Sequence, residues 1–124
     1  YQQSDLQYLI VHALDGYDEV SLTGDFKITT AQSEQILSPI HLGLDTLAPA
    51  QLSGGDTLAD SAKIFLNVLN DEATTAQKQV VLANAGLALY AANPSLSLTD
   101  AIATARESLE SKRALACFKK LIED

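Results

Sequence analysis

The sequence predicts an α/β fold in which a few N-terminal strands are followed by about four helices. Two observations support this prediction. Residues 8–13, YLIVHA, form a nearly continuous apolar run, and the segment after residue 56 repeats apolar residues at helical spacing. The helix expected around residues 80–92 is apolar almost all round. Such a strand and such a helix need more neighbours than the rest of the chain supplies, so we expect a fragment of a larger α/β protein.

The strands are expected within residues 1–30. The apolar run at residues 8–13 suits a strand covered on both faces, as in a parallel sheet. Turn-forming residues 14–19, LDGYDE, interrupt it. Residues 20–24 then alternate between apolar and polar side chains, and residues 26–28 alternate again, so two further short strands are predicted.

Residues 38–124 are predicted to be mainly helical. Ser38-Pro39 can open a short helical turn, which Gly43 closes. Each of the next three helices begins at a side-chain oxygen that can accept hydrogen bonds from free backbone N–H groups. These starts are Asp56 or Thr57, Thr74 or Thr75, and the capping box Ser97-Leu98-Thr99-Asp100.

The spacing of apolar residues predicts which helix faces turn inward. The second helix, ended by Asn93-Pro94, should be central and buried because residues 80–92 are apolar on nearly every side. The other inward faces are Leu58, Ala62, Phe65, Leu66 and Leu69 in the first helix, Leu98, Ile102, Ala105 and Leu109 in the third, and Leu115, Phe118, Leu121 and Ile122 in the last.

Composition argues against several classes of function. The net charge of −8 disfavours nucleic-acid and membrane-surface partners, because binding to either depends on clustered basic side chains. No apolar run reaches the roughly 18–20 residues that cross a bilayer, and no secretory signal is visible. The single Cys117 cannot form an internal disulfide, so a cytoplasmic protein is expected. The absence of methionine and the start at Tyr1 indicate a cut chain.

The loop Asp15-Gly16-Tyr17-Asp18-Glu19 has the clearest chemical potential. In open α/β sheets, ligands gather at the loops that follow the carboxyl ends of strands. In such a loop Asp18 and Glu19 can both turn toward one cation. Magnesium is typically held by one or two carboxylates together with substrate phosphates, so the pair suits a Mg²⁺ site. A solvated acidic turn is the alternative, since these residues usually lie on the surface.

The residues around this loop resemble those of anthranilate phosphoribosyltransferases. The likeness runs through residues 10–24 (IVHALDGYDEVSLTG), continues at residues 37–39, 43–44 and 52–56, and includes residues 81–90 (VLANAGLALY) and the terminal helices. The block DG-x-DE-x-S-x-TG and the helix N-A-x-x-A-L-Y are its most specific parts. The resemblance implies a fragment of a phosphoribosyltransferase/nucleoside phosphorylase-type catalytic domain. Residues 1–124 would be one C-terminal portion of it, with strands and the acidic loop in 1–30 and helices in 38–124.

The resemblance also implies an activity. Family members transfer the phosphoribosyl group from phosphoribosyl pyrophosphate to anthranilate in tryptophan biosynthesis, commonly as homodimers. By position, Asp18 and Glu19 would hold the magnesium ion that helps to bind pyrophosphate. The family's glycine-rich phosphate loop, its Lys-His-Gly-Asn-Arg-Ser-type segment and its anthranilate-contacting arginine are not found in this sequence. No catalytic residue is therefore assigned, and the chain alone is expected to be inactive.

Two other functions stay open at this stage, a pyrimidine nucleoside phosphorylase-like enzyme and a non-catalytic scaffold or interaction module.

Other residues suit structural roles. Residues 54–56, GGD, lack the wider pattern of a phosphate loop and are expected to form a turn before a helix. His12 has no second ligand at metal spacing. Asn84 and Tyr90 are expected to pack, with Asn84 requiring hydrogen-bond partners, and Cys117 is expected to be buried.

Overall fold

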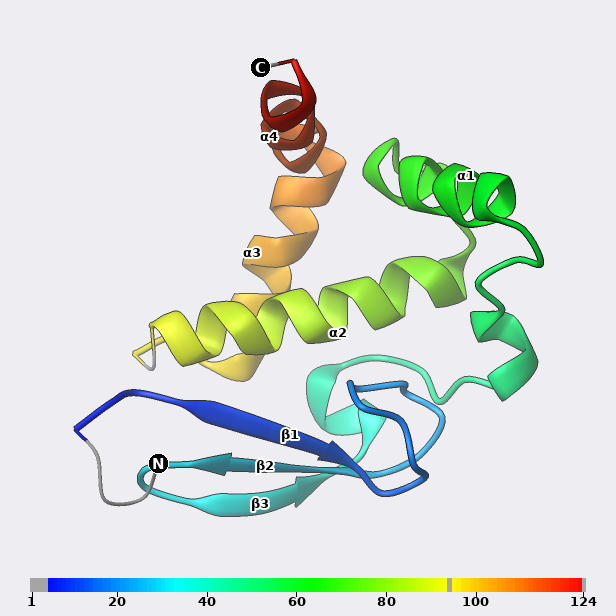
Figure 1. Cartoon of the computed structure of the whole chain (residues 1–124). Helices are drawn as coiled ribbons and strands as arrows, with labels where there is room; N and C mark the ends of the chain where they lie inside the picture. Colours follow the sequence, from blue (N-terminus) through cyan, green and yellow to red (C-terminus); the bar gives the residue numbers. More distant parts are fainter. Residues whose placement is uncertain (1–4, 94, 124) are drawn as a thin grey trace.

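The computed structural model describes residues 5–93 and 95–123, and the expectations for Tyr1 and Pro94 lie outside these ranges. A three-stranded sheet lies at one end of the molecule, and four helices follow it in the chain, as the sequence predicts (Figure 1). Two short 3₁₀ turns, η1 (Pro39–Leu42) and η2 (Pro49–Leu52), connect the sheet to the helices. No helix in the described ranges is long and apolar enough to cross a bilayer.

The sheet is an antiparallel meander of β1 (Leu9–Ala13), β2 (Phe26–Thr30) and β3 (Glu34–Leu37), in the order β1-β2-β3. The parallel pairing expected for the first strand is not found within the described residues, since β1 pairs antiparallel with β2. The chain between these strands is a loop that reverses direction, whereas a parallel pair needs a crossover, usually a helix. One face of β1 is exposed at Ile10 and His12, so the strand is not covered on both faces here.

The strand predicted at residues 20–24 is wrong. These residues form part of the loop between β1 and β2, although Val20 and Leu22 are fully buried. Leu22 has a φ of 62°, which is incompatible with an extended strand. Its carbonyl instead accepts a hydrogen bond from the Leu47 N–H at 2.8 Å. The pattern of alternation therefore reflects burial of a loop against the core.

The four helices are α1 (Leu58–Leu69), α2 (Thr75–Ala92), α3 (Leu98–Glu110) and α4 (Arg113–Ile122). Three of them begin at predicted capping residues, which the structure identifies as Thr57, Thr74 and Ser97. Each of these side chains accepts a hydrogen bond from the backbone N–H three residues later. The starts of these helices therefore coincide with capping bonds between residues close in sequence.

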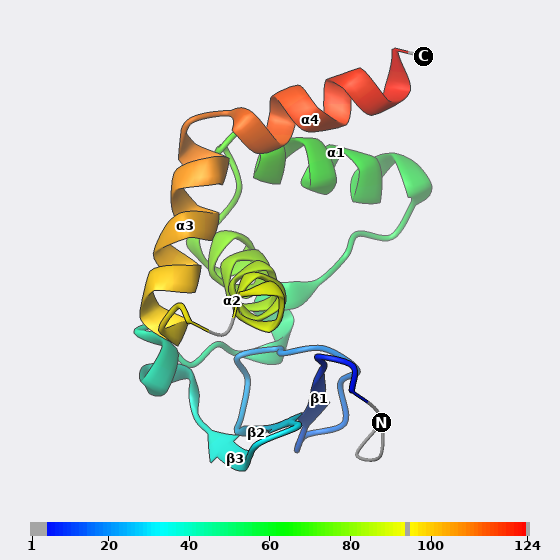
Figure 2. The same cartoon turned by 90° about the vertical axis from the view of Figure 1, so that its left-hand side faces the viewer.

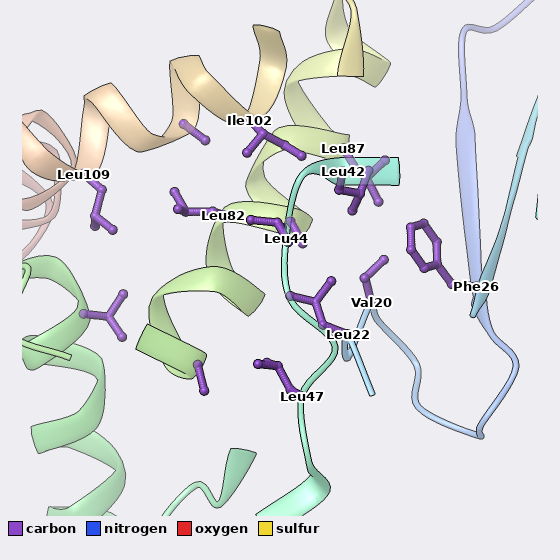
Figure 3. Close-up of a cluster of buried hydrophobic side chains, with 14 of the residues drawn as sticks. Val20, Leu22, Phe26, Leu42, Leu44, Leu47, Leu82, Leu87, Ile102 and Leu109 are labelled. Atoms are coloured by element: carbon purple, nitrogen blue, oxygen red, sulfur yellow. The ribbon is translucent and has the colours of Figure 1, made fainter. Parts of the chain in front are cut away.

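Helix α2 is central, as expected, and separates the sheet from the pair formed by α1 and α4 (Figure 2). It packs closely on α3, where a Cβ added to Gly86 would lie 2.5 Å from Ile102 Cγ1. The hydrophobic core joins these helices to the sheet: Figure 3 shows Val20 and Phe26 on the sheet side of the cluster. The burial predicted for α2 is incomplete, because Val81 is exposed.

The predicted inward faces of the helices are buried to different extents. In α3, Ile102, Ala105 and Leu109 are buried, which confirms the predicted face. Helices α1 and α4 lie side by side (Figure 2). They touch through Phe65 and Phe118, whose rings meet edge to face with centroids 5.0 Å apart. The remainder of their predicted faces is largely exposed, at Leu58, Phe65, Leu66, Leu121 and Ile122.

Candidate functional site

The acidic loop, residues 14–25, joins β1 to β2 and starts at the carboxyl end of β1 (Figure 1). Its base is closed by the Leu14 N–H, which donates to the Asp25 carbonyl at 2.9 Å. Gly16 then turns the backbone with a φ of 95°, a conformation that favours glycine. Asp18 and Glu19 follow in irregular backbone, and both are exposed. The loop therefore presents two neighbouring carboxylates to solvent.

Asp15 ties the start of the loop to its end. Its carboxylate accepts a hydrogen bond from the Thr23 hydroxyl and lies 3.5 Å from Ser21 Oγ. The two hydroxyl groups are themselves 2.7 Å apart. A Cβ added to Gly24 would lie 3.2 Å from Asp15 Oδ2, so a glycine there permits the close approach. These contacts explain why Asp, Ser, Thr and Gly surround the acidic pair, a role for Asp15 that the sequence analysis did not identify.

Asn84 of α2 bonds to the loop backbone on the C-terminal side of the acidic pair. The Val20 N–H donates to Asn84 Oδ1 at 3.0 Å, and Asn84 Nδ2 donates to the Val20 carbonyl at 2.8 Å. Nδ2 also donates to the Val80 carbonyl within α2 at 2.9 Å. The expectation that Asn84 finds hydrogen-bond partners is confirmed. Its partner Val20 directly follows Glu19, so α2 anchors the backbone beside the acidic pair.

A groove of about 580 Å³ is lined by this loop, the end of η2 with the residues that follow it, and residues of α1 and α2. Glu19 is one of its lining residues, and apolar side chains such as Leu52, Val68 and Val81 line most of the rest. Asn84 reaches the groove from α2. Glu19 is therefore accessible to a ligand placed in this concave surface, and the exposed Asp18 precedes it on the loop.

The donor set fits part of a magnesium site. Within residues 5–93 and 95–123, no cluster of three or more His, Cys, Asp or Glu side chains could enclose a metal ion. Asp18 and Glu19 supply hard carboxylate oxygens, and both are open to solvent. Magnesium commonly keeps several waters and is held by one or two carboxylates plus substrate phosphates. Two carboxylates on an exposed loop match that requirement, and the assignment of both as ligands stays a prediction.

The other residues considered from sequence lie elsewhere. His12 is exposed on β1, outside the core. Residues 54–56 form the expected turn ahead of the Thr57 cap, with Gly55 at a φ of 87°. The predicted burial of Cys117 is wrong, because Cys117 is exposed on α4. Neighbouring positions of a helix point about 100° apart, so packing of the adjacent Phe118 against α1 leaves Cys117 outside the contact.

The chain is similar in sequence to known glycosyl transferases. Residues 4–115 match the family model described as "Glycosyl transferase family, a/b domain". An anthranilate phosphoribosyltransferase of Cytophaga hutchinsonii is 57% identical over 99% of this chain, which covers 38% of that relative. The corresponding protein of Bacteroides thetaiotaomicron is 49% identical over 99% of this chain and 37% of its own length. The chain therefore spans little more than a third of these curated relatives.

Two solved structures have a similar fold. The anthranilate phosphoribosyltransferase of Thermus thermophilus superposes with a TM-score of 0.79 at 29% identity, covering 90% of this chain and 33% of that chain. The enzyme of Saccharomyces cerevisiae in complex with PRPP and Mg superposes with a TM-score of 0.82 at 20% identity. That match covers 93% of this chain and 33% of the yeast chain.

Proposed function

Since this chain belongs to the glycosyl transferase family through its a/b domain, we propose that it is the C-terminal part of the catalytic domain of an anthranilate phosphoribosyltransferase. The longer enzyme would transfer the phosphoribosyl group from phosphoribosyl pyrophosphate to the amine of anthranilate, in tryptophan biosynthesis. Identities of 57% and 49% to proteins of that name support this activity. A neighbouring structure that holds PRPP and Mg supports the use of these ligands.

The observation that carries the proposal is the exposed Asp18–Glu19 pair on an anchored loop at the carboxyl end of β1. We assign these carboxylates the binding of Mg²⁺. A bound magnesium ion would neutralise the charge that develops on the departing pyrophosphate. The protein's own contribution is geometric: Asp15 and Asn84 hold the two sides of the loop, so that the carboxylates meet the ligand with little rearrangement.

The remaining elements of the site would come from other parts of the longer enzyme. The sequence described here contains no glycine-rich phosphate loop and no anthranilate-contacting arginine of the family type. We therefore assign phosphoribosyl transfer to the longer enzyme and expect none from the 124-residue chain. A cytoplasmic location, a homodimeric longer enzyme, and the absence of nucleic-acid and membrane partners stay predictions.

Product analysis tests the proposed activity. The longer enzyme is incubated with anthranilate, phosphoribosyl pyrophosphate and Mg²⁺, and the loss of anthranilate is compared with the release of pyrophosphate. We expect the two to change in equal amounts, and we expect neither with the 124-residue chain alone. Phosphate-dependent cleavage of a pyrimidine nucleoside, with no use of anthranilate, would instead identify the phosphorylase-like alternative. No turnover of either kind would favour the non-catalytic scaffold.

A further inference from the structure

We propose that Asn84 is a positioning residue that sets how Asp18 and Glu19 meet Mg²⁺. The inference rests on the proposed metal role of these carboxylates and adds a residue from a helix distant in sequence. Asn84 and Val20 are 64 positions apart, yet the Asn84 amide is bonded to both polar backbone groups of Val20. The effect of Asn84 on the metal would thus pass through the backbone of the loop.

The two bonds fix the backbone that leaves Glu19. The Val20 N–H, bonded at 3.0 Å, belongs to the peptide unit that joins Glu19 to Val20. The Val20 carbonyl, bonded at 2.8 Å, belongs to the next peptide unit. The Val20 side chain is also buried, with 1% of its surface exposed. Movement of the Glu19 main chain is therefore restrained from its C-terminal side, while its side chain stays exposed.

The orientation of the Asn84 amide is itself determined by its partners. Nδ2 has two donor hydrogens, and they serve the carbonyls of Val20 and Val80 at 2.8 and 2.9 Å. A flipped amide would place Oδ1 against two carbonyl oxygens and Nδ2 against the Val20 N–H. An apolar side chain would satisfy neither group of Val20. An aspartate could accept from the Val20 N–H but could not, as a carboxylate, donate to the carbonyls.

The opposite side of the loop has its own restraint, so loss of Asn84 would free one side selectively. Asp15 bonds to the Thr23 hydroxyl, so we expect this restraint to stay in place when Asn84 is replaced. Removing a group that hydrogen-bonds to a metal ligand and orients it typically weakens metal binding about 10- to 100-fold. We therefore expect a variant at Asn84 to weaken Mg²⁺ binding without removing any ligand.

The chain offers a control in Gln79. This residue lies on the same helix, and its amide also hydrogen-bonds to a loop. The Asp45 N–H donates to Gln79 Oε1 at 3.0 Å, and Nε2 donates to Asp45 Oδ2 at 2.7 Å. Gln79→Ala and Asn84→Ala each remove two hydrogen bonds between α2 and a loop, those of Gln79 being exposed and those of Asn84 partly buried. Only Asn84→Ala affects the residue beside Glu19.

The test measures Mg²⁺-dependent pyrophosphate binding by calorimetry in the longer enzyme, with the melting temperature of each variant. We expect Asn84→Ala to raise the apparent Kd for Mg²⁺ about 10- to 100-fold, and Gln79→Ala to leave it unchanged. In steady-state kinetics, saturating Mg²⁺ should restore kcat in Asn84→Ala, because the ligands are intact. A general folding defect would instead lower kcat at every Mg²⁺ concentration, and that result would overturn the inference.

A second variant covers a failure of Asn84→Ala to fold. Asn84→Asp keeps the side-chain volume and the acceptor for the Val20 N–H, and it should show the same weakened Mg²⁺ binding. Equal Mg²⁺ affinities in Asn84→Asp, Gln79→Ala and the unmodified enzyme would overturn the positioning role. The proposed function fails separately, if Asp18→Asn with Glu19→Gln leaves Mg²⁺-dependent binding intact. If Mg²⁺-dependent binding is lost in the Asp18/Glu19 double variant but unchanged in the Asn84 variants, only the positioning role of Asn84 is contradicted.

Discussion

Asn84 on α2 pairs with the backbone of Val20 on the acidic loop through two hydrogen bonds, 3.0 Å to the N–H and 2.8 Å to the carbonyl. Helix and loop are thus joined as one unit at the residue that follows Glu19. The same helix packs on α3 on another face, where Gly86 meets Ile102. The position of the carboxylates consequently depends on the packing of the helices as well as on the loop.

Amide hydrogen exchange should detect this pairing directly. The Val20 N–H is both buried and bonded to Asn84, so we expect it to be among the slowly exchanging loop amides of the 124-residue chain. Asn84→Ala should accelerate its exchange, as measured by NMR on ¹⁵N-labelled protein. The Asp45 N–H, which bonds to Gln79, serves as internal control and should not change. Rapid exchange of the Val20 N–H in the unmodified chain would contradict the bond.

Gly86→Ala should destabilise the chain. The new Cβ would lie 2.5 Å from Ile102 Cγ1 and 3.1 Å from Ile102 Cα, so part of the clash involves backbone. Overpacking of this kind costs about 1–3 kcal/mol, against a gain of about 1 kcal/mol from alanine's better helix propensity. We expect a net loss in urea denaturation. Gly54→Ala is the control, because nothing lies within 4 Å of its added Cβ; equal stabilities of the two variants would argue against tight packing of α2 on α3.

Thr23→Val should loosen the start of the acidic loop. The substitution keeps the shape of the side chain and removes the hydroxyl that donates to Asp15. Because Asp15 is exposed, we expect a loss of only about 1 kcal/mol in the free energy of unfolding. Thr29→Val removes a hydroxyl whose contact with Glu34 is longer, 3.4 Å, and exposed, so it should have little effect. A larger loss from Thr29→Val in urea titrations would count against the assigned role of Asp15.

An ion pair predicts how stability varies with pH. Lys78 Nζ lies 2.7 Å from Asp71 and 2.8 Å from Glu110, linking the turn before α2 to the end of α3. The hydrogen bond from Lys78 lowers the pKa of Asp71 below its ordinary 3.8. Hydrogen bonds to Asp71 and Glu110 raise the pKa of Lys78 above its ordinary 10.5. Each shift stabilises the folded chain while both groups are charged.

The pH window follows from the direction of each shift. Stability linked to Asp71 is present above pH 3.8 and is lost as pH falls through its lowered pKa. Stability linked to Lys78 is present below pH 10.5 and is lost as pH rises through its raised pKa. The difference in Tm between the unmodified chain and Lys78→Met should therefore be constant near neutral pH and shrink at both extremes. A difference that stays the same in strong acid would contradict the pairing.

Local features of the fold were predictable from sequence. The caps Thr74 and Ser97 act within one turn of their helices, and the inward face of α3 follows from its periodicity. The loop position of Asp18 and Glu19 followed from the turn residues around them. These properties depend on neighbours in sequence, which is why the sequence alone was sufficient.

Features set by distant contacts were missed. Leu22 resembles a strand residue, but its positive φ accompanies a bond from Leu47, in a later segment of the chain. Strand β3, with sequence EQIL, is mostly exposed and lacks the apolar alternation that would predict it; its pairing with β2 includes an ion pair from Lys27 to Glu34 at 2.9 Å. The hydrogen bonds of Asn84 to Val20 could not be predicted either, because no local pattern links positions so far apart.

Magnesium-dependent binding of pyrophosphate tests the central claim most directly. Calorimetric titrations would compare the unmodified longer enzyme with Asp18→Asn/Glu19→Gln and with the control Asp71→Asn/Glu72→Gln. The control alters an exposed Asp-Glu pair of equal charge on another turn and, of the ion pairs among the described residues, breaks only that of Asp71 with Lys78. We predict that Mg²⁺ strengthens pyrophosphate binding in the unmodified enzyme and in the control, and has no effect in the first variant. If Mg²⁺ strengthens pyrophosphate binding equally in all three proteins, Asp18 and Glu19 do not hold the metal.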